Sequence, residues 1–165
     1  MAVASVSAVL LAAGASERMG AHKALIPWMG TTLLQYQIDQ LASLDALREI
    51  VVVTGSRADD LRPLVAQAAK AREAHNAAWA SGKASSVRCA AAAVAPDADA
   101  ILLLAVDQPR PARLLRALIE SHDGAASRIT VPVFEGRRGH PLIFGRALLP
   151  ELLAVDDATR GARAV

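Results

Sequence analysis

Cysteine, aromatic residues and long apolar runs are all scarce in this chain of 165 residues. The single cysteine, Cys89, excludes an intrachain disulfide framework and a cysteine-rich zinc site. Five aromatic residues leave little for stacking on single-stranded nucleic acid, and a net charge of +2 from scattered arginines is too small for a nucleic-acid footprint. No apolar run approaches the ~20 residues that cross a bilayer. We therefore expect a soluble, cytoplasmic protein that binds small molecules, with neither nucleic acid nor a membrane as a partner.

Buried strands and helices alternate along the chain, which is the pattern of an α/β domain. The runs at Val6–Ala12, Glu49–Thr54 and Ile101–Val106 are continuously apolar, as is typical of strands covered on both faces of a sheet. Shorter strands are expected at Ala71–His75, Ile129–Phe134 and Pro141–Phe144. We expect one domain over residues 1–165, built on a doubly wound, mainly parallel sheet.

Helix signals fill the gaps between these strands. Thr32 and Gln35 have the spacing of a capping box before an apolar helical stripe. Asp59 or Asp60 is expected to cap the next helix, with Pro63 in its first turn. Further helices are expected in an alanine-rich stretch that ends near Val94, from Pro111 onwards, and over Leu148–Val155.

A glycine-containing loop follows the first strand. The segment Val9–Leu25 reads V-L-L-A-A-G-A-S-E-R-M-G-A-H-K-A-L. Backbone N–H groups in such a loop form an anion site at the edge of a sheet. Three neighbouring side chains suit phosphate oxygens: Ser16, Arg18 and Lys23. The spacing fits neither the dinucleotide fingerprint nor the P-loop. We expect Glu17 and His22 to be surface residues.

The topology predicts a second group at the same edge of the sheet. Ligands of doubly wound sheets bind beyond the carboxyl ends of the strands, where Gly14, Gly55, Asn76 and Asp107 each follow a different strand. A carboxylate in the position of Asp107 suits Mg²⁺ held between phosphates. An aspartate before Pro109 equally suits a turn or a helix cap, so the residues alone leave both roles open.

Several segments resemble one known family. The loop L-A-A-G-A-S-E-R-M-G-A-H-K closely resembles the signature of nucleotidyltransferases of the molybdenum-cofactor type, and most of all the cytidylyltransferase branch, with L-A-A-G-x-S-x-R-[FM]-G-x-x-K. V-D-Q-P, N-A-A-W-A-S-G-K-A-S-S and G-R-R-G-H-P-L-I-F resemble three later segments of the family, and D-D-A-T-R-G-A-R resembles its D-x-G-A-R segment with two extra residues. The resemblance implies a Rossmann-like, GT-A-like three-layer sandwich.

The resemblance, together with the topology, assigns a role to each matching residue. Catalytic roles fall on Arg18, Lys23 and Asp107, with Asp107 as the metal ligand. His140 and Asp157 are assigned to the second substrate. The nucleotide-binding residues are Leu11, Ala12, Ala13, Gly14, Ser16, Arg18, Lys23, Gly55, Asn76, Gly82, Ser85 and Ser86.

The implied activity is the Mg²⁺-dependent transfer of CMP from CTP to the phosphate of molybdopterin, with release of pyrophosphate and a molybdoenzyme as the recipient of the cofactor. CTP is favoured over GTP because guanylyl-transferring relatives carry L-A-G-G where this chain has Ala13, whose methyl group would crowd a purine. Three alternatives remain. One is the same fold acting on GTP or another phosphorylated acceptor, and one is an NAD(P)H-dependent oxidoreductase of the family's dye-reducing branch. The third is a non-catalytic protein that binds and delivers a nucleotide or cofactor.

Overall fold

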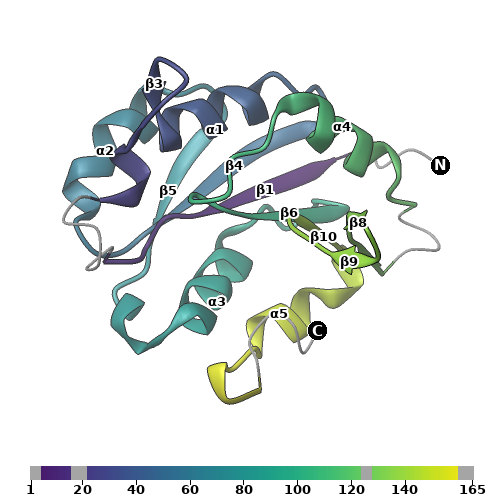
Figure 1. Ribbon diagram of the computed structural model, residues 1–165. Helices are drawn as coiled ribbons and strands as arrows, with labels where there is room; N and C mark the ends of the chain where they lie inside the picture. Colours follow the sequence, from purple (N-terminus) through teal and green to yellow (C-terminus); the bar gives the residue numbers. More distant parts are fainter. Residues whose placement is uncertain (1–4, 16–21, 124–127, 160–165) are drawn as a thin grey trace.

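A six-stranded sheet forms the middle layer of the molecule, and the computed structural model describes residues 5–15, 22–123 and 128–159 (Figure 1). The strand order is β5-β4-β1-β6-β10-β7. In chain order these strands are β1 (Val6–Leu11), β4 (Leu47–Thr54), β5 (Ala71–His75), β6 (Ala100–Ala105), β7 (Ile129–Thr130) and β10 (Leu142–Gly145).

Strands β5, β4, β1 and β6 are parallel, as the sequence predicts. In the centre of the sheet Val9 is level with Val51 on β4 and with Leu103 on β6. Strand β10 runs antiparallel to both of its neighbours, and its first residue, Leu142, pairs with Leu103. The chain therefore enters β10 at the same edge of the sheet at which it leaves β1 and β6.

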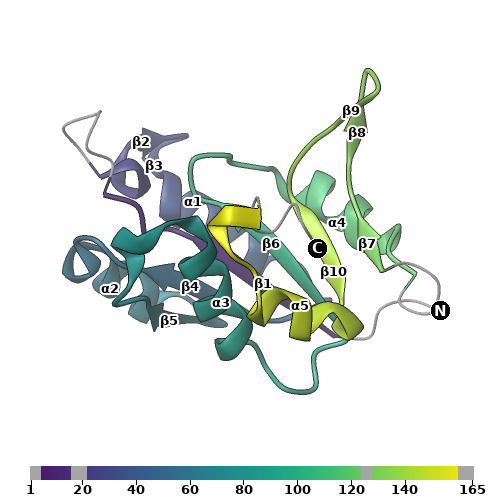
Figure 2. The same ribbon diagram turned by 90° about the horizontal axis from the view of Figure 1, so that it is seen from below.

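Helices cover both faces of the sheet, which confirms the doubly wound arrangement (Figures 1 and 2). On one face lie α1 (Leu33–Ala42), α2 (Ala58–Gln67) and α4 (Ala112–Glu120), and on the other lie α3 (Lys83–Ala93) and α5 (Leu149–Leu153). Because successive strand residues point to opposite faces, β1 serves both layers. Ala8 and Leu10 belong to the core under α1, whereas Val9 belongs to the core over α3.

Short elements connect these layers. They are the 3₁₀ turns η2 (Lys23–Leu25), η3 (Trp79–Ser81), η4 (Arg146–Leu148) and η5 (Asp157–Thr159), and the strands β2 (Pro27–Trp28), β3 (Thr31–Thr32), β8 (Val133–Phe134) and β9 (Arg137–Arg138). Among the described residues, no helix has the length and apolar character needed to cross a membrane.

Local predictions fared unevenly at the helix starts. Thr32 caps α1 as predicted, since its hydroxyl accepts the Gln35 N–H at 3.2 Å. The Gln35 side chain, the other half of the predicted capping box, donates to Asp39 at 2.8 Å. The prediction for α2 was wrong, because neither Asp59 nor Asp60 is its cap and Pro63 lies beyond the first turn. Arg57 occupies the cap position in a left-handed conformation, with φ 54° and ψ 38°. The helix therefore begins one residue before Asp59.

The expected strand at 129–134 is two strands. Pro132 has no N–H to donate to a neighbour, and the ladder of the central sheet stops at Thr130. The next two residues, Val133 and Phe134, pair instead with Arg138 and Arg137 in a separate hairpin that stands away from the sheet (Figure 2).

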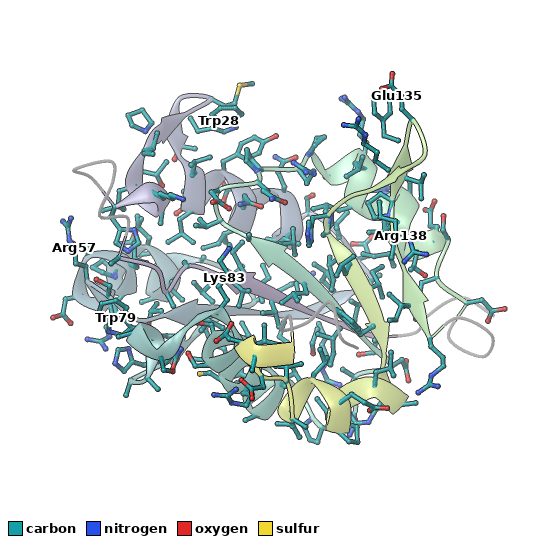
Figure 3. All side chains as sticks on the ribbon, turned by 60° about the horizontal axis from the view of Figure 1, so that its bottom comes forward. Trp28, Arg57, Trp79, Lys83, Glu135 and Arg138 are labelled. Carbon is teal, nitrogen blue, oxygen red and sulfur yellow. The ribbon has the colours of Figure 1, made fainter. Side chains whose placement is uncertain are left out.

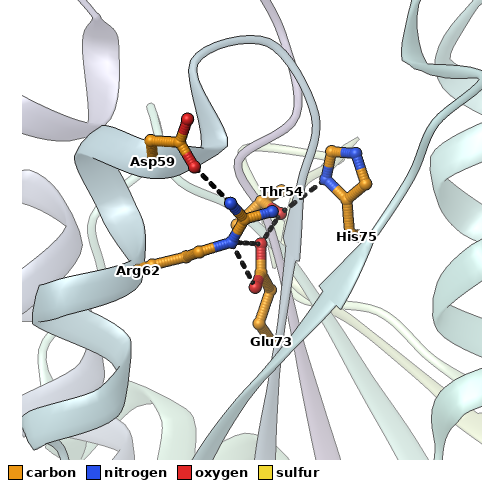
Figure 4. A network of polar contacts seen from close by, with 5 residues as sticks. All are labelled: Thr54, Asp59, Arg62, Glu73 and His75. Atoms are coloured by element: carbon orange, nitrogen blue, oxygen red, sulfur yellow. Dashed lines mark hydrogen bonds and ion pairs between the residues drawn. The ribbon is translucent and has the colours of Figure 1, made fainter.

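A polar network fastens the edge strand β5 to its neighbours (Figure 4). The buried Thr54 hydroxyl, at the end of β4, donates to Glu73 on β5. Arg62 of α2 donates to the same carboxylate through Nε, at 2.8 Å, and is paired with Asp59. The Nδ1 atom of His75 lies 3.3 Å from the Thr54 hydroxyl. The contacts of Thr54 and Arg62 with Glu73 hold the carboxyl ends of β4 and β5 in line, just before Gly55 and Asn76.

Candidate active site

An open cleft of about 360 Å³ lies at the carboxyl ends of β1 and β6, the edge that the topology predicted. This volume falls in the range of small-molecule sites, roughly 300–1,000 Å³. Four stretches of chain form its walls: the end of β1 with the turn after it, the start of η2, η3 with the start of α3, and the end of β6 with the residues after it. The lining residues are Leu11, Ala12, Ala13, Gly14, Ala15, His22, Lys23, Trp79, Ala80, Gly82, Lys83, Ser86, Ala105, Val106 and Asp107.

The turn after β1 is held from below by backbone hydrogen bonds. The Ala12 N–H donates to the Val53 carbonyl at 2.9 Å, and the Ser56 N–H donates to the Ala13 carbonyl at 3.1 Å. Gly14 is exposed at the mouth of the cleft, and a Cβ built on it meets nothing within 4 Å. Phosphate-sized groups therefore have room at Gly14. Ser16 and Arg18, two predicted phosphate ligands, lie outside the described residues.

Lys23 and Asp107 meet across the cleft. Lys23 begins η2, and Asp107 follows β6. The Lys23 ammonium nitrogen lies 3.2 Å from Oδ2 of Asp107, and the two side chains are 39% and 46% exposed. Two of the predicted catalytic residues are thus brought together at the predicted edge.

His22 is not the surface residue that the sequence suggested. It is only 2% exposed, and its ring lines the cleft. Its Nδ1 accepts the Ala24 N–H at 3.3 Å, and its Nε2 lies 3.2 Å from the Ser56 carbonyl oxygen. Burial lowers the pKa of the His22 imidazole below its ordinary value, and this effect outweighs the hydrogen bond to the Ser56 carbonyl, which raises the pKa. Arg57 makes a smaller contribution in the direction of burial. Residue spacing gave no sign of this, because the burial comes from a contact 34 positions away.

Gln37 is a second residue that sequence reasoning missed. It is 1% exposed on α1, and its Nε2 donates to the carbonyls of Ala105 and Val106 at 3.1 and 2.8 Å. These two carbonyls end β6 immediately before Asp107, so Gln37 fixes the chain that carries the carboxylate. A signal was present, because Gln37 falls within the apolar stripe formed by Leu34, Ile38 and Leu41.

Asn76 organises the wall formed by the start of α3. Its side-chain amide donates to the hydroxyls of Ser85 and Ser86 at 2.8 and 3.0 Å, and its Oδ1 accepts the Ala78 N–H at 3.0 Å. Asn76 is buried and, like Ser85, does not line the cleft, whereas Ser86 does. The amide therefore shapes the wall from behind.

Gly55 supports this wall through close packing. A Cβ at Gly55 would lie 2.5 Å from Cβ of Trp79 and 2.8 Å from the Ala13 carbonyl oxygen. Gly55 itself does not line the cleft, but Trp79 does. Lys83 is exposed, and it lines the cleft at the first residue of α3 (Figure 3). The cleft thus has a second lysine besides Lys23.

The two residues predicted for a second substrate lie beside the cleft, outside its lining. The Asp157 carboxylate accepts the Ala84 N–H, at 3.1 and 3.2 Å to its two oxygens, and so stabilises the first turn of α3. His140 is exposed, and its carbonyl accepts a hydrogen bond from Nε of Arg110 at 3.1 Å. His140 shares the edge of Asp107, because β10 starts where β6 ends.

Asp107 suits a metal site in which substrate phosphates supply most of the ligands. Within residues 5–15, 22–123 and 128–159, no three His, Cys, Asp or Glu side chains gather as a metal site would require. A zinc or calcium cage is therefore not built from these residues. Mg²⁺ commonly uses one or two carboxylates together with substrate phosphates. Asp107, the one carboxylate that lines the cleft among the described residues, fits that donor set.

Sequence comparison gives the family. The model of the MobA-like NTP transferase domain matches residues 8–165. The chain belongs to this family. Two curated relatives align over almost its whole length. Nicotine blue oxidoreductase of Paenarthrobacter nicotinovorans is 32% identical over 96% of this chain and 79% of its own. Molybdenum cofactor cytidylyltransferase of Escherichia coli is 28% identical over 99% of this chain and 82% of its own.

Solved structures agree with this assignment. A nucleotidyl transferase from Methanothermobacter thermautotroptrophicus superposes with a TM-score of 0.76 at 28% identity, covering 93% of this chain and 77% of that one. Rv0371c from Mycobacterium tuberculosis, in complex with manganese, superposes with a TM-score of 0.72 at 29% identity, covering 96% of this chain and 78% of that one. The protein is a nucleotidyltransferase with a Rossmann-like fold.

Proposed function

We propose that the protein transfers CMP from CTP to the phosphate of molybdopterin and releases pyrophosphate. The observation that carries the proposal is the meeting of the turn at Gly14, the Lys23 ammonium and the Asp107 carboxylate at one cleft. The 28% identity with the molybdenum cofactor cytidylyltransferase of Escherichia coli supports the choice of substrates. A molybdoenzyme in the cytoplasm is the recipient that this activity implies.

The reaction needs positioning and charge neutralisation more than a reactive side chain. An oxygen of the pterin phosphate attacks the α-phosphorus of CTP in line. The bond from that phosphorus to the bridging oxygen breaks, and pyrophosphate leaves with the electron pair. Backbone N–H groups beside Gly14 and the Lys23 ammonium stabilise the charge on the phosphate oxygens, and Arg18 is proposed to join them. No covalent enzyme intermediate is required, because phosphate supplies both reacting partners.

Mg²⁺ is the metal that we propose for this reaction, with Asp107 as its protein ligand. Bound there, the ion would neutralise negative charge on the phosphates. Lys23 lies close to Oδ2 of the same carboxylate and so keeps the side chain directed across the cleft. The relative from Mycobacterium tuberculosis was solved in complex with manganese, a divalent ion of similar preference for oxygen ligands.

Ala13 is the proposed determinant of the base. It is 6% exposed and lines the cleft directly after β1, so its methyl group occupies space that a glycine would leave to a larger base. A single methyl group discriminates between ligands by about 1–3 kcal/mol. We therefore expect CTP to be preferred over GTP by about tenfold to a hundredfold.

A second candidate function is favoured by the 32% identity with nicotine blue oxidoreductase. In that case the cleft would hold a nicotinamide cofactor, and a hydride would pass from it to a pyridine dye. No pyrophosphate would be released.

Pyrophosphate release separates these functions. The protein is incubated with molybdopterin, Mg²⁺ and either CTP or GTP, and separately with NADPH and a pyridine dye. Faster release with CTP supports the proposal, and equal rates with the two nucleotides would remove the preference for CTP. Oxidation of NADPH without any pyrophosphate release would establish the second candidate, and nucleotide binding without turnover would indicate a delivery protein.

A further inference from the structure

We propose that His22 is the positioning residue that holds Lys23 at the phosphate side of the cleft, and that it does so only as the neutral imidazole with its proton on Nε2. This inference rests on the proposed nucleotidyl transfer and deepens it. It assigns a role to a buried side chain that the reaction itself does not use.

The two hydrogen bonds of the ring define its protonation state. Nδ1 accepts the N–H of Ala24, so it carries no proton. Nε2 faces the carbonyl oxygen of Ser56, which can only accept, so Nε2 must carry the proton. Of the three states open to a histidine, only the Nε2–H tautomer satisfies both partners.

Through these contacts His22 joins the two sides of the phosphate end of the cleft. Its Nδ1 caps the turn η2, whose first residue is Lys23. Its Nε2 reaches Ser56, and the N–H of Ser56 donates to the Ala13 carbonyl in the turn after β1. The backbone of Ser56 therefore lies between the segment beneath Gly14 and the segment that carries Lys23. Removal of the ring would free the Lys23 turn from this support.

Protonation of His22 would break the hydrogen bond that Nδ1 accepts from the Ala24 N–H. A proton on Nδ1 would face the Ala24 N–H, so that a donor would meet a donor and the cap of η2 would be lost. The hydrogen bond to the Ser56 carbonyl favours the protonated ring, as Asp60 does to a smaller extent, whereas Arg57 disfavours it. These two side chains are paired with each other at 2.7 Å, and the nearby pair of Lys23 and Asp107 is likewise of opposite charge. Burial has the largest effect and lowers the pKa of His22, so the neutral ring prevails at neutral pH.

The protonation state can be read directly by NMR. Long-range ¹H–¹⁵N correlation of the ¹⁵N-labelled protein, with His22→Asn used for assignment, distinguishes a protonated from an unprotonated ring nitrogen. We expect a protonated Nε2 and an unprotonated Nδ1 at about pH 7.5. A proton on Nδ1 would overturn the inference. The measurement uses the free protein and does not depend on turnover.

Two substitutions test the consequence for catalysis. His22→Asn keeps a side-chain oxygen that can accept the Ala24 N–H but cannot titrate, and His22→Ala removes both contacts. A lost cap costs about 1 kcal/mol, so we expect His22→Ala to lower kcat/KM for CTP about fivefold at pH 8 and His22→Asn to retain most of it. In the wild type, protonation of His22 should contribute to the fall in kcat/KM at low pH. Because asparagine does not titrate, we expect kcat/KM of His22→Asn to fall less steeply as the pH is lowered.

The matched control is His75→Asn, which changes an exposed histidine outside the cleft lining. It should leave the pH profile of the wild type unchanged. Equal activity of His22→Ala and the wild type at pH 8 would contradict the inference, as would an identical acid limb in His22→Asn and the wild type. An inactive wild type whose ring carries its proton on Nε2 would contradict the proposed transfer, while the NMR result would still support the tautomer.

Discussion

Lys23 and Asp107 are separated by 84 positions in the chain, yet the ammonium nitrogen and a carboxylate oxygen lie 3.2 Å apart. Both side chains are more than one-third exposed, and ion pairs of that kind contribute only about 0–1 kcal/mol to folding. The pair is therefore poorly explained as a stabilising contact. Lys23 and Asp107 place one positive and one negative group on the cleft, as the proposed binding of phosphates and a divalent cation requires.

We expect Asp107→Asn to lower the rate of nucleotidyl transfer about a hundredfold or more, because the amide cannot hold a cation between phosphates. The free energy of unfolding should change by less than about 1 kcal/mol. Pyrophosphate release and urea unfolding measure the two effects.

Asp97→Asn is the matched control for Asp107→Asn. Asp97 forms an exposed pair with Arg48 and does not line the cleft. The control should retain wild-type activity. A fully active Asp107→Asn variant would contradict the role assigned to this carboxylate and would favour a delivery protein.

Gln37→Leu is expected to affect both stability and activity. The substitution leaves the Ala105 and Val106 carbonyls without the amide that they contact in the structure. The Ala105 carbonyl still accepts the Gln108 N–H, so the loss falls on the Val106 carbonyl. A buried carbonyl without a partner costs roughly 1–3 kcal/mol, and urea unfolding should show a loss of that size. Activity should fall as well, because these residues set the position of Asp107.

Gln35→Leu serves as the control on the same helix, since the Gln35 amide donates to Asp39, an exposed residue, at 2.8 Å. Its unfolding free energy should stay within about 0.5 kcal/mol of the wild type. If both variants had the same stability and activity, the contact between Gln37 and the end of β6 would have no consequence.

Glycine-to-alanine substitutions should distinguish a glycine needed for packing, Gly55, from a glycine needed for ligand binding, Gly14. Gly55→Ala places a methyl group within 3 Å of Trp79 and the Ala13 carbonyl, and overpacking of this kind costs about 1–3 kcal/mol. Gly14→Ala meets nothing within 4 Å and should leave stability unchanged. If phosphates approach Gly14, the same substitution should weaken CTP binding. Thermal unfolding and titration calorimetry with CTP test the contrast, and equal stability losses would refute it.

His122 should make the folded protein sensitive to acid. It is 1% exposed at the end of α4, its Nδ1 lies 2.8 Å from the Thr130 hydroxyl, and burial lowers its pKa. The unfolded chain takes up a proton as the pH falls below 6.5, whereas the folded ring stays neutral to a lower pH. The unfolded state then binds more protons, so stability decreases as the pH falls.

His122→Asn, which keeps a partner for Thr130, should remove this contribution. Urea unfolding at about pH 7.5 and about pH 5.5 should show a smaller loss of stability for the variant than for the wild type. A wild-type loss unchanged by His122→Asn would show that other groups are responsible.

The sequence was most informative where its pattern and the physical cause were local. Continuous apolar runs located β1, β4 and β6, and the rule for doubly wound sheets located the cleft at their carboxyl ends. The predicted strand after residue 128 was wrong in its extent, because Pro132 interrupts it. The cap of α2 was wrong because Arg57 adopts a left-handed conformation that acidic residues further on do not reveal.

Site residues were harder to predict where their partners are distant in the chain. His22 and Gln37 are polar, yet both are buried by contacts that exist only once β1, β4 and β6 are assembled. Conversely, Asn76 has the position expected of it but turns its amide towards Ser85 and Ser86. Residue type indicated which side chains matter, and the contacts of the assembled sheet decided what each one touches.

Because β10 runs antiparallel to β6, the segment that precedes β10 lies at the same edge of the sheet as the cleft. The turns after β1, β4 and β6 belong to strands in fixed parallel register, whereas the segment at 131–141 leaves β7 and enters the antiparallel strand β10 at this same edge of the sheet. Exchange of this segment between relatives would alter the chain between β7 and β10 and would leave the strands beneath Gly14 and Asp107 unchanged. If His140 contacts the second substrate, we expect replacement of this loop to change the preference for the acceptor without altering the residues around Gly14.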